Sequence, residues 1–266
     1  MSNPSQPGAD DDRAAAPAGV PPADGQFAAD VAALTEDNVA PATRRQILGR
    51  MVARQARARG IRGLFRPKTM ISWIADSVGD VAPYIPVRDL ATLREHHDGL
   101  EGDALAERLI RNAARVTTGI GAAGGGVAAV EWVVTPTLLS APVLLATETV
   151  AVVAVEVKLI GELHEVYGRA VPGTGTQRAL HLVQAWAQQR GVNPLAAGRG
   201  VSAALGTATR KELRDRLVRR FGRNLSTMGP FLTGAAVAGF LNRRSTLSLG
   251  EQIRKDLIHR PKVIDG

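Results

Sequence analysis

Isolated glutamates in a long apolar stretch are the side chains with the clearest capacity for chemistry. The stretch runs from residue 117 to residue 168 and contains Glu131, Glu148 and Glu156 among Ala, Val and Leu. A carboxylate removed from water needs a partner, because an unpaired buried charge is costly. We therefore expect Glu148 to meet a basic residue or a helix N-terminus within a packed bundle. Lys158 follows in the same stretch, and Glu148 and Lys158 form the candidate functional polar pair.

Three other motifs suggest chemistry that their context does not support. Gly119, Gly121 and Gly124 have the spacing of a dinucleotide-binding loop, but that loop must follow a strand and none is predicted here. Residues 96–98 read His-His-Asp, yet adjacent histidines on a helix point about 100° apart and do not converge on one metal ion. His164 lies beside a glutamate, and packing is its simpler role. We predict no catalytic, cofactor-binding or metal-binding residue, and no enzyme.

Helical periodicity accounts for most of the chain, and no segment alternates as a strand would. The segment that begins at residue 103 carries a clear apolar stripe, and a long helix is predicted from Ala141 to Tyr167, ending at Gly168. Further helices are predicted over residues 69–81, 176–190, 210–221 and 247–259, and a basic amphipathic helix that begins near residue 42 is predicted to be followed by Gly60 and a break at Pro67. The expected fold is all-α, a compact multi-helix bundle with a Gly-rich central helical hairpin and a disordered N-terminal tail.

Charge and composition divide the chain unevenly. Residues 1–40 are rich in Pro and Ala and hold seven acidic residues against one arginine, whereas the whole chain has a formal net charge of +8. Few large apolar side chains occur in the first part of this segment, so burial cannot offset the entropy of ordering it. We predict a disordered acidic tail over residues 1–40, basic amphipathic and short helices over 41–99, and a helical core over 100–262. Cysteine is absent, which excludes disulfides and a cysteine nucleophile.

Arginine dominates the first predicted helix that follows the tail. Residues 42–68 contain nine basic residues and no acidic one. The candidate contacts with an anionic membrane surface are Arg44, Arg45, Arg50, Arg54 and Arg57. The same helix could instead contact nucleic acid or pack on its own domain. The first residues lack the basic and apolar regions of a secretory signal, so we expect a protein that stays in the cytoplasm.

Two uncharged segments, 132–147 and 224–242, approach the length of a membrane span. Proline interrupts both and glutamates bracket the first, so neither offers the roughly 20 apolar residues that a spanning helix needs. We expect shallow or reversible membrane association, with a soluble buried hairpin as the alternative. Small residues four positions apart allow close helix packing in lipid or in protein. The candidate helix-packing residues are Gly121, Gly125, Gly234 and Ala238.

Two blocks of sequence resemble a known family. The first is residues 117–126 (TTGIGAAGGG) with Glu148, Lys158 and Tyr167-Gly168, and the second is residues 228–234 (MGPFLTG) with Gly239 and Asn242. Together they resemble the EcsC-like family over residues 100–260, although Glu148 and Lys158 stand where Asp and Arg are usual. The resemblance implies association with membranes and no established activity, and it lowers the expectation of an enzyme.

The sequence therefore predicts a non-enzymatic helical protein that is peripheral to the inner face of the cell membrane and associates with it reversibly. The alternative is a soluble helical adaptor or a homo-oligomeric protein-interaction module. A nucleic-acid-binding surface is a weaker reading, because a recognisable reader motif is absent and aromatic residues are few. The expected partner is an anionic membrane surface, with a protein partner or a second copy as the alternative. No cofactor is expected.

Overall fold

The computed structural model describes five segments of the chain, residues 22–59, 67–134, 141–173, 175–190 and 235–259. Every regular element in these segments is helical. In chain order they are α1 (Pro22–Leu34), α2 (Pro41–Arg59), α3 (Pro67–Val81), the 3-10 turn η2 (Ala82–Tyr84), α4 (Leu90–His96), α5 (Gly102–Val134), α6 (Ala141–Val166), α7 (Gly175–Gln189) and α9 (Ala235–His259). The expected all-α fold is confirmed.

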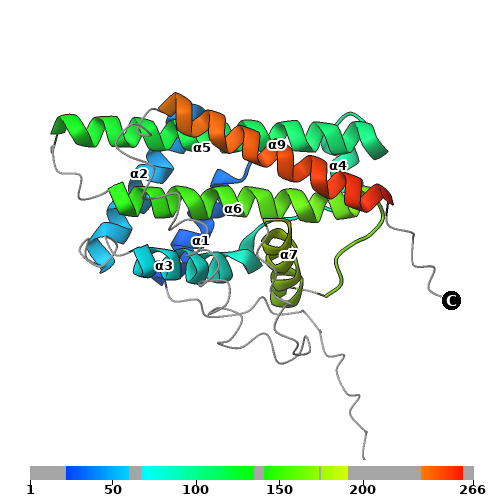
Figure 1. Cartoon of the computed structure of the whole chain (residues 1–266), viewed down its shortest axis with the longest axis horizontal. Helices are drawn as coiled ribbons and strands as arrows, with labels where there is room; N and C mark the ends of the chain where they lie inside the picture. The colour runs from blue at the N-terminus through cyan, green and yellow to red at the C-terminus, as the bar shows by residue number, and fades with distance from the viewer. Residues whose placement is uncertain (1–21, 60–66, 135–140, 174, 191–234, 260–266) are drawn as a thin grey trace, which may run out of the picture.

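Three long helices form the centre of the molecule (Figure 1). Helix α5 runs antiparallel to both α6 and α9, so the Gly-rich hairpin of α5 and α6 is joined by a helix from the far end of the sequence. The shorter helices α1 and α3 pack against α6, α2 packs against both α5 and α6, and α7 packs against α6, α9 and η2. The hairpin is therefore covered on several sides.

Helix α6 is the most enclosed part of the fold. Every residue from Val153 to Leu163 is buried, including the charged residues Glu156, Lys158 and Glu162. A helix that is buried all round has no solvated face on which to place a charge. These three side chains must consequently find their partners inside the protein.

Small residues bring α5 and α9 into close contact. A Cβ atom on Gly121 would lie 2.8 Å from the carbonyl carbon of Ala238 and 2.8 Å from the nitrogen of Gly239. Gly121 and Ala238, both predicted as packing residues, thus meet across two different helices. Gly125 is half-buried on α5, and Gly234 lies outside the described residues.

Helix α1 lies inside the segment that was expected to be a disordered tail. Phe27 and Val31 occur at helical spacing and are buried in the core. Asp30, on the same face, is also buried, and its carboxylate lies 3.0 Å from Nη1 of Arg54. The prediction of disorder is wrong for residues 22–34, because a short apolar stripe and the ion pairs of Asp30 order a segment whose average composition is that of a tail.

The start of the last helix differs from the predicted one. Helix α2 ends at Arg59, directly before Gly60 as predicted, whereas α9 begins at Ala235, twelve residues before the predicted start at 247. The additional turns of α9 consist mainly of small residues, which lack the apolar stripe that signals a helix. Residues 1–21 and the predicted helix over 210–221 lie outside the described residues.

The end of α6 was predicted correctly. Gly168 adopts a φ of 63°, and the amide of Arg169 donates to the carbonyl oxygen of His164 at 2.8 Å, which caps the last turn. In the described part of the chain, no helix has both the length and the apolar composition of a membrane span.

Candidate functional site

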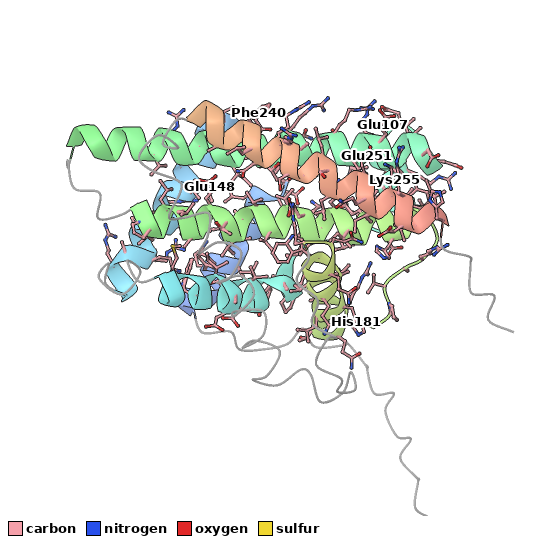
Figure 2. The ribbon with its side chains drawn as sticks, viewed as in Figure 1. Glu107, Glu148, His181, Phe240, Glu251 and Lys255 are labelled. Carbon is pink, nitrogen blue, oxygen red and sulfur yellow. The ribbon has the colours of Figure 1, made fainter. Side chains whose placement is uncertain are left out.

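A polar contact joins the three long helices near the start of α6 and α9. Glu148 on α6 accepts a hydrogen bond from Asn242 on α9, with 3.0 Å between Oε1 and Nδ2. The same Nδ2 lies 3.4 Å from the carbonyl oxygen of Thr117 on α5. Figure 2 places Glu148 near the beginning of α6, on the side of that helix that faces α9. Residues 94 positions apart in the sequence therefore meet here.

Glycines on α5 provide the space for these two side chains. A Cβ atom on Gly124 would overlap Oε2 of Glu148, and one on Gly121 would lie 2.8 Å from Nδ2 of Asn242. The carboxyl and carboxamide groups consequently lie directly against the backbone of α5. The glycine-rich part of α5 is helical and positions a polar pair, which a helix of larger residues would exclude.

Polar contacts continue from Asn242 along α9. Thr246, one turn further on, lies with its Oγ1 3.1 Å from Oγ1 of Thr117, and it donates to Oε1 of Glu156 at 3.0 Å. Both threonine side chains are buried. The two hydroxyl groups thus connect the contact at Glu148 with the second carboxylate of α6.

Glu156 has a complete set of partners. It is 1% exposed, accepts a hydrogen bond from Nε1 of Trp186 at 2.8 Å and forms an ion pair with Arg190. Trp186 is on α7 and Arg190 follows its last residue, so the carboxylate also anchors that helix. We call the connected set the polar line: Glu148, Asn242, Thr117, Thr246, Glu156, Trp186 and Arg190.

The two carboxylates of the polar line differ in charge compensation. Arg190 neutralises Glu156, whereas Glu148 is hydrogen-bonded to the neutral amide of Asn242, and no cation in the described segments pairs with it. Burial raises the pKa of Glu148 from 4.5 to about 7, because desolvation disfavours the ionised form more than the hydrogen bond from Asn242 favours it. Glu148 can therefore gain or lose a proton close to neutral pH.

This pKa predicts how stability depends on pH. Between pH 4.5 and about 7 the unfolded chain ionises Glu148 while the folded chain keeps it protonated, so folding loses stability as pH rises through this window. The loss of folding free energy over the whole window amounts to about 3 kcal/mol, since one pKa unit corresponds to about 1.4 kcal/mol. We expect Glu148→Gln to remove it, so that the variant is more stable than the wild type at pH 8 by about 2 kcal/mol and nearly equal to it at pH 5. Urea unfolding at the two pH values measures this difference.

Glu107→Gln is the matched control for the pH measurement. Glu107 is exposed on α5 and pairs with Arg111 one turn away, so its removal changes the same charge on a solvated surface. Its effect should stay within about 0.5 kcal/mol at both pH values. A difference between Glu148→Gln and the wild type that is the same at pH 5 and pH 8 would contradict the raised pKa.

Lys158 is buried but does not contact Glu148. Its Nζ lies 3.3 Å from Oε1 of Glu36 and 3.4 Å from the carbonyl oxygen of Thr35. Ten residues of helix separate Glu148 from Lys158 by about 15 Å along the axis. The structure therefore does not bring the candidate polar pair together. The expectation of a basic residue or helix N-terminus beside Glu148 is also wrong, since the amide of Asn242 occupies that position.

A second charged cluster fastens the turn after α1 to α6. Arg88 donates two hydrogen bonds to Glu162, at 2.7 and 3.0 Å, and lies 3.4 Å from Asp37. Beside Lys158 these groups line a cavity of about 10 Å³, which holds about one water molecule. The positive and negative groups compensate one another, and the cavity is too small for an organic ligand, so we assign this cluster a structural role.

The arginines of α2 serve different purposes. Arg44 is only 4% exposed, and its guanidinium donates to carbonyl oxygens of Leu34, Glu36 and Val39. The prediction that Arg44 contacts a membrane surface is wrong, because its guanidinium N–H groups bind carbonyl oxygens inside the fold.

The other arginines of α2 are more accessible. Arg50 and Arg54 lie 3.7 and 3.0 Å from the carboxylate of Asp30, while Arg45 and Arg57 have exposed side chains. Two of the five predicted contacts are thus partly neutralised by α1. The free basic surface of α2 is smaller than its sequence indicates.

The remaining motifs have ordinary settings. Gly119, Gly121 and Gly124 lie within α5 and form no strand-to-helix loop. Residues 96–98 form the end of α4 and its turn, where Asp98 has a φ of 56°. No group of three or more potential ligands that could hold a metal ion occurs in the described segments. The side chain of Glu131 lies outside the described part.

The sequence indicated some members of the polar line and missed others. Glu148 and Glu156 stood out as lone acids, and Asn242 belonged to the second family-like block. Thr246, Trp186 and Arg190 gave no signal, because each is an ordinary residue on an amphipathic helix. Comparisons of the chain with protein-family models, with curated proteins and with solved structures found no match.

Proposed function

We propose that this protein is a non-enzymatic helical module that associates reversibly with an anionic membrane surface, through the end of the bundle where α6 and α9 begin. The observation that carries the proposal is a group of exposed apolar side chains at that end. Leu145 on α6 is 42% exposed, and Phe240 and Leu241 on α9 are 59% and 41% exposed. Each lies within one turn of the hydrogen bond between Glu148 and Asn242.

Exposed arginines accompany these apolar side chains. Arg243 and Arg244 follow them directly on α9. Arg45 of α2 lies beside Gly126 of α5, 3.1 Å from the position of a Cβ atom there. We call this set the docking end: Leu145, Phe240, Leu241, Arg45, Arg243 and Arg244. Figure 2 shows Phe240 on the outer side of α9 near its start.

Apolar and cationic side chains favour a lipid surface for complementary reasons. Each large apolar side chain contributes roughly 1.5–3 kcal/mol when it is fully removed from water. Each cation near an anionic leaflet contributes about 1 kcal/mol more. Three of each are sufficient for a reversible interaction. The net charge of +8 supports the same partner, because it attracts the whole molecule towards anionic lipid.

Sedimentation with lipid vesicles tests the proposal. We expect the protein to bind vesicles that contain phosphatidylglycerol, to bind pure phosphatidylcholine vesicles weakly, and to be released by high salt. Replacing Arg45, Arg243 and Arg244 by glutamine should reduce binding at least about tenfold, given the contribution of each cation. Replacing Phe240 and Leu241 by serine should reduce it on both types of vesicle.

A second triple variant is the matched control. Arg111, Arg115 and Arg254 lie further along α5 and α9, and their replacement by glutamine removes the same charge from another part of the surface. This control should retain binding much better than the variant of the docking end. If the two triple variants lost binding equally, attraction by net charge alone would explain the binding, and the docking end would have no special role. Absence of binding, together with self-association that Phe240→Ser and Leu241→Ser abolish, would favour the soluble adaptor or homo-oligomer.

Membership of the EcsC-like family is a related proposal. Its support is that the first block, through Gly121, Gly124 and Glu148, lies against the second block at Gly239 and Asn242. The resembling residues therefore cooperate in one place. A cytoplasmic location at the inner face of the membrane belongs to the same proposal, and fractionation with salt and carbonate washes tests it. Salt should release the protein from the membrane fraction.

A further inference from the structure

Glu148 lies between the interior of the bundle and the docking end. Its carboxyl group rests on Gly124 and accepts from Asn242, while Leu145 precedes it by three residues on the same helix. Leu145, Phe240 and Leu241 are exposed within one helical turn of this half-buried contact, so a surface that covers them would reduce the access of water to the carboxyl group. Removal from water costs much more free energy for an ionised carboxylate than for a protonated carboxyl group.

Among the described residues, the charged groups around Glu148 do not neutralise it. Helix α5 has no charged residue between Gly119 and Val127. Helix α9 contributes Arg243 and Arg244, which are exposed, in contrast to the half-buried Asn242. The next charged residue on α6 is Glu156, two turns away and paired with Arg190.

Helix α2 also approaches this place but leaves the carboxylate without a cation. Leu48 of α2 lies against Gly124, with its Cδ2 3.7 Å from the position of a Cβ atom there. The guanidinium of Arg44 is bound to backbone carbonyls, and that of Arg45 lies beside Gly126. Helix α3, which packs on α6, carries Asp76 and Asp80 with exposed side chains.

We propose that protonation of Glu148 controls docking, so that the protein binds an anionic membrane tightly when this carboxyl group is neutral and weakly when it is ionised. The inference rests on the proposed function and adds a proton as its regulator. The geometry explains why this acid has the role. Of the acids whose side chains are described, Glu148 is the one whose carboxyl group lies at the level of the docking end. It rests against Gly124, and its partner is an amide that can donate to either protonation state.

The raised pKa of Glu148, about 7, places the transition in the physiological range. If docking requires the neutral form, affinity should be about tenfold higher at pH 6 than at pH 8. We expect Glu148→Gln to bind phosphatidylglycerol vesicles equally at both pH values, with the affinity of the wild type at pH 6. Glu107→Gln, which is far from the docking end, should keep the pH dependence of the wild type.

Gly124→Ala provides an independent test without removing the acid. The added methyl group occupies the position of Oε2 and pushes the carboxyl group towards water, where its pKa falls. The midpoint of vesicle binding should therefore move to lower pH, whereas Glu148→Gln abolishes the midpoint. Circular dichroism and urea unfolding verify that both variants are folded.

The possible outcomes separate the two proposals. Binding that retains its full pH dependence in Glu148→Gln overturns the proton switch and leaves membrane docking intact, since histidines or lipid headgroups then cause the dependence. Binding that does not change with pH in the wild type also overturns the switch. Failure of every protein to bind at any pH overturns docking itself, and the switch with it.

Discussion

Glu156→Ala is expected to lower the free energy of unfolding by about 3–5 kcal/mol. The substitution removes the acceptor for Trp186 and Thr246 and leaves the guanidinium of Arg190 without its carboxylate. Because Glu156 is almost fully enclosed, water cannot take its place without a cavity opening in the core. Urea unfolding measures the loss, and the slope of the transition shows whether the unfolding remains two-state.

Two companion variants divide this loss into its causes. Glu156→Gln keeps one of the two acceptor oxygens, so it can accept from Trp186 or from Thr246 but not from both, and it removes the charge that compensates Arg190. We expect a loss of about 1–3 kcal/mol, smaller than that of Glu156→Ala. Glu107→Ala breaks an exposed ion pair on α5 and should change stability by less than about 0.5 kcal/mol. A loss in Glu156→Ala that is no larger than in Glu107→Ala would show that the polar line does not hold the core together.

The position of the damage is also predictable. Trp186 and Arg190 connect the end of α7 with α6 through Glu156, whereas Arg178 near the start of α7 keeps its ion pair with Glu165. The end of α7 should therefore loosen before the long helices do. Hydrogen exchange should therefore accelerate in the amides of α7 in Glu156→Ala, while those of α5 keep their protection. Uniform acceleration throughout the bundle would instead indicate a global loss of stability.

Local patterns predicted the helices well. The apolar stripe of α5 and the glycine that ends α6 depend on residues within a few turns, and such signals survive in a single sequence. The start of α9 was missed, because a helix of small residues is stabilised by its contact with α5 and not by its own pattern. Helix α1 was missed for a similar reason, since Phe27 and Val31 gain their burial from other helices.

The partners of the charged residues could not be predicted in the same way. The sequence marked Glu148 as an acid in need of a partner, but the choice between Lys158, ten residues away, and Asn242, 94 residues away, depends on which helices meet. Arg44 illustrates the reverse error: its sequence context is a basic surface, yet its guanidinium closes the turn between α1 and α2. The sequence shows which charged residues need partners, but the tertiary fold decides which residues pair.

A series of glycine substitutions is expected to show how much stability depends on the close contact of α5 with α9. An alanine at this contact should destabilise the protein, whereas an alanine at an open helical position should stabilise it. In Gly121→Ala the new Cβ atom meets backbone atoms of Ala238 and Gly239 at 2.8 Å, and a backbone cannot rotate away as a side chain can. The two helices must then move apart, which should cost about 2–3 kcal/mol. Gly79→Ala, on α3, places its Cβ atom where nothing lies within 4 Å, so it should stabilise the protein by about 0.5–1 kcal/mol.

Two further substitutions should have intermediate costs, which depend on the atom that the new Cβ atom approaches. Gly239→Ala approaches the carbonyl oxygen of Thr118 at 3.0 Å and should cost less than Gly121→Ala, because the overlap is smaller. Gly124→Ala meets the end of the Glu148 side chain, which can swing aside, so its cost should be smaller still. Urea unfolding of the four variants at one pH gives the order. If Gly121→Ala stabilised the protein as Gly79→Ala does, α9 would not lie against α5 at this glycine, and the hydrogen bond between Glu148 and Asn242 would lose its structural basis.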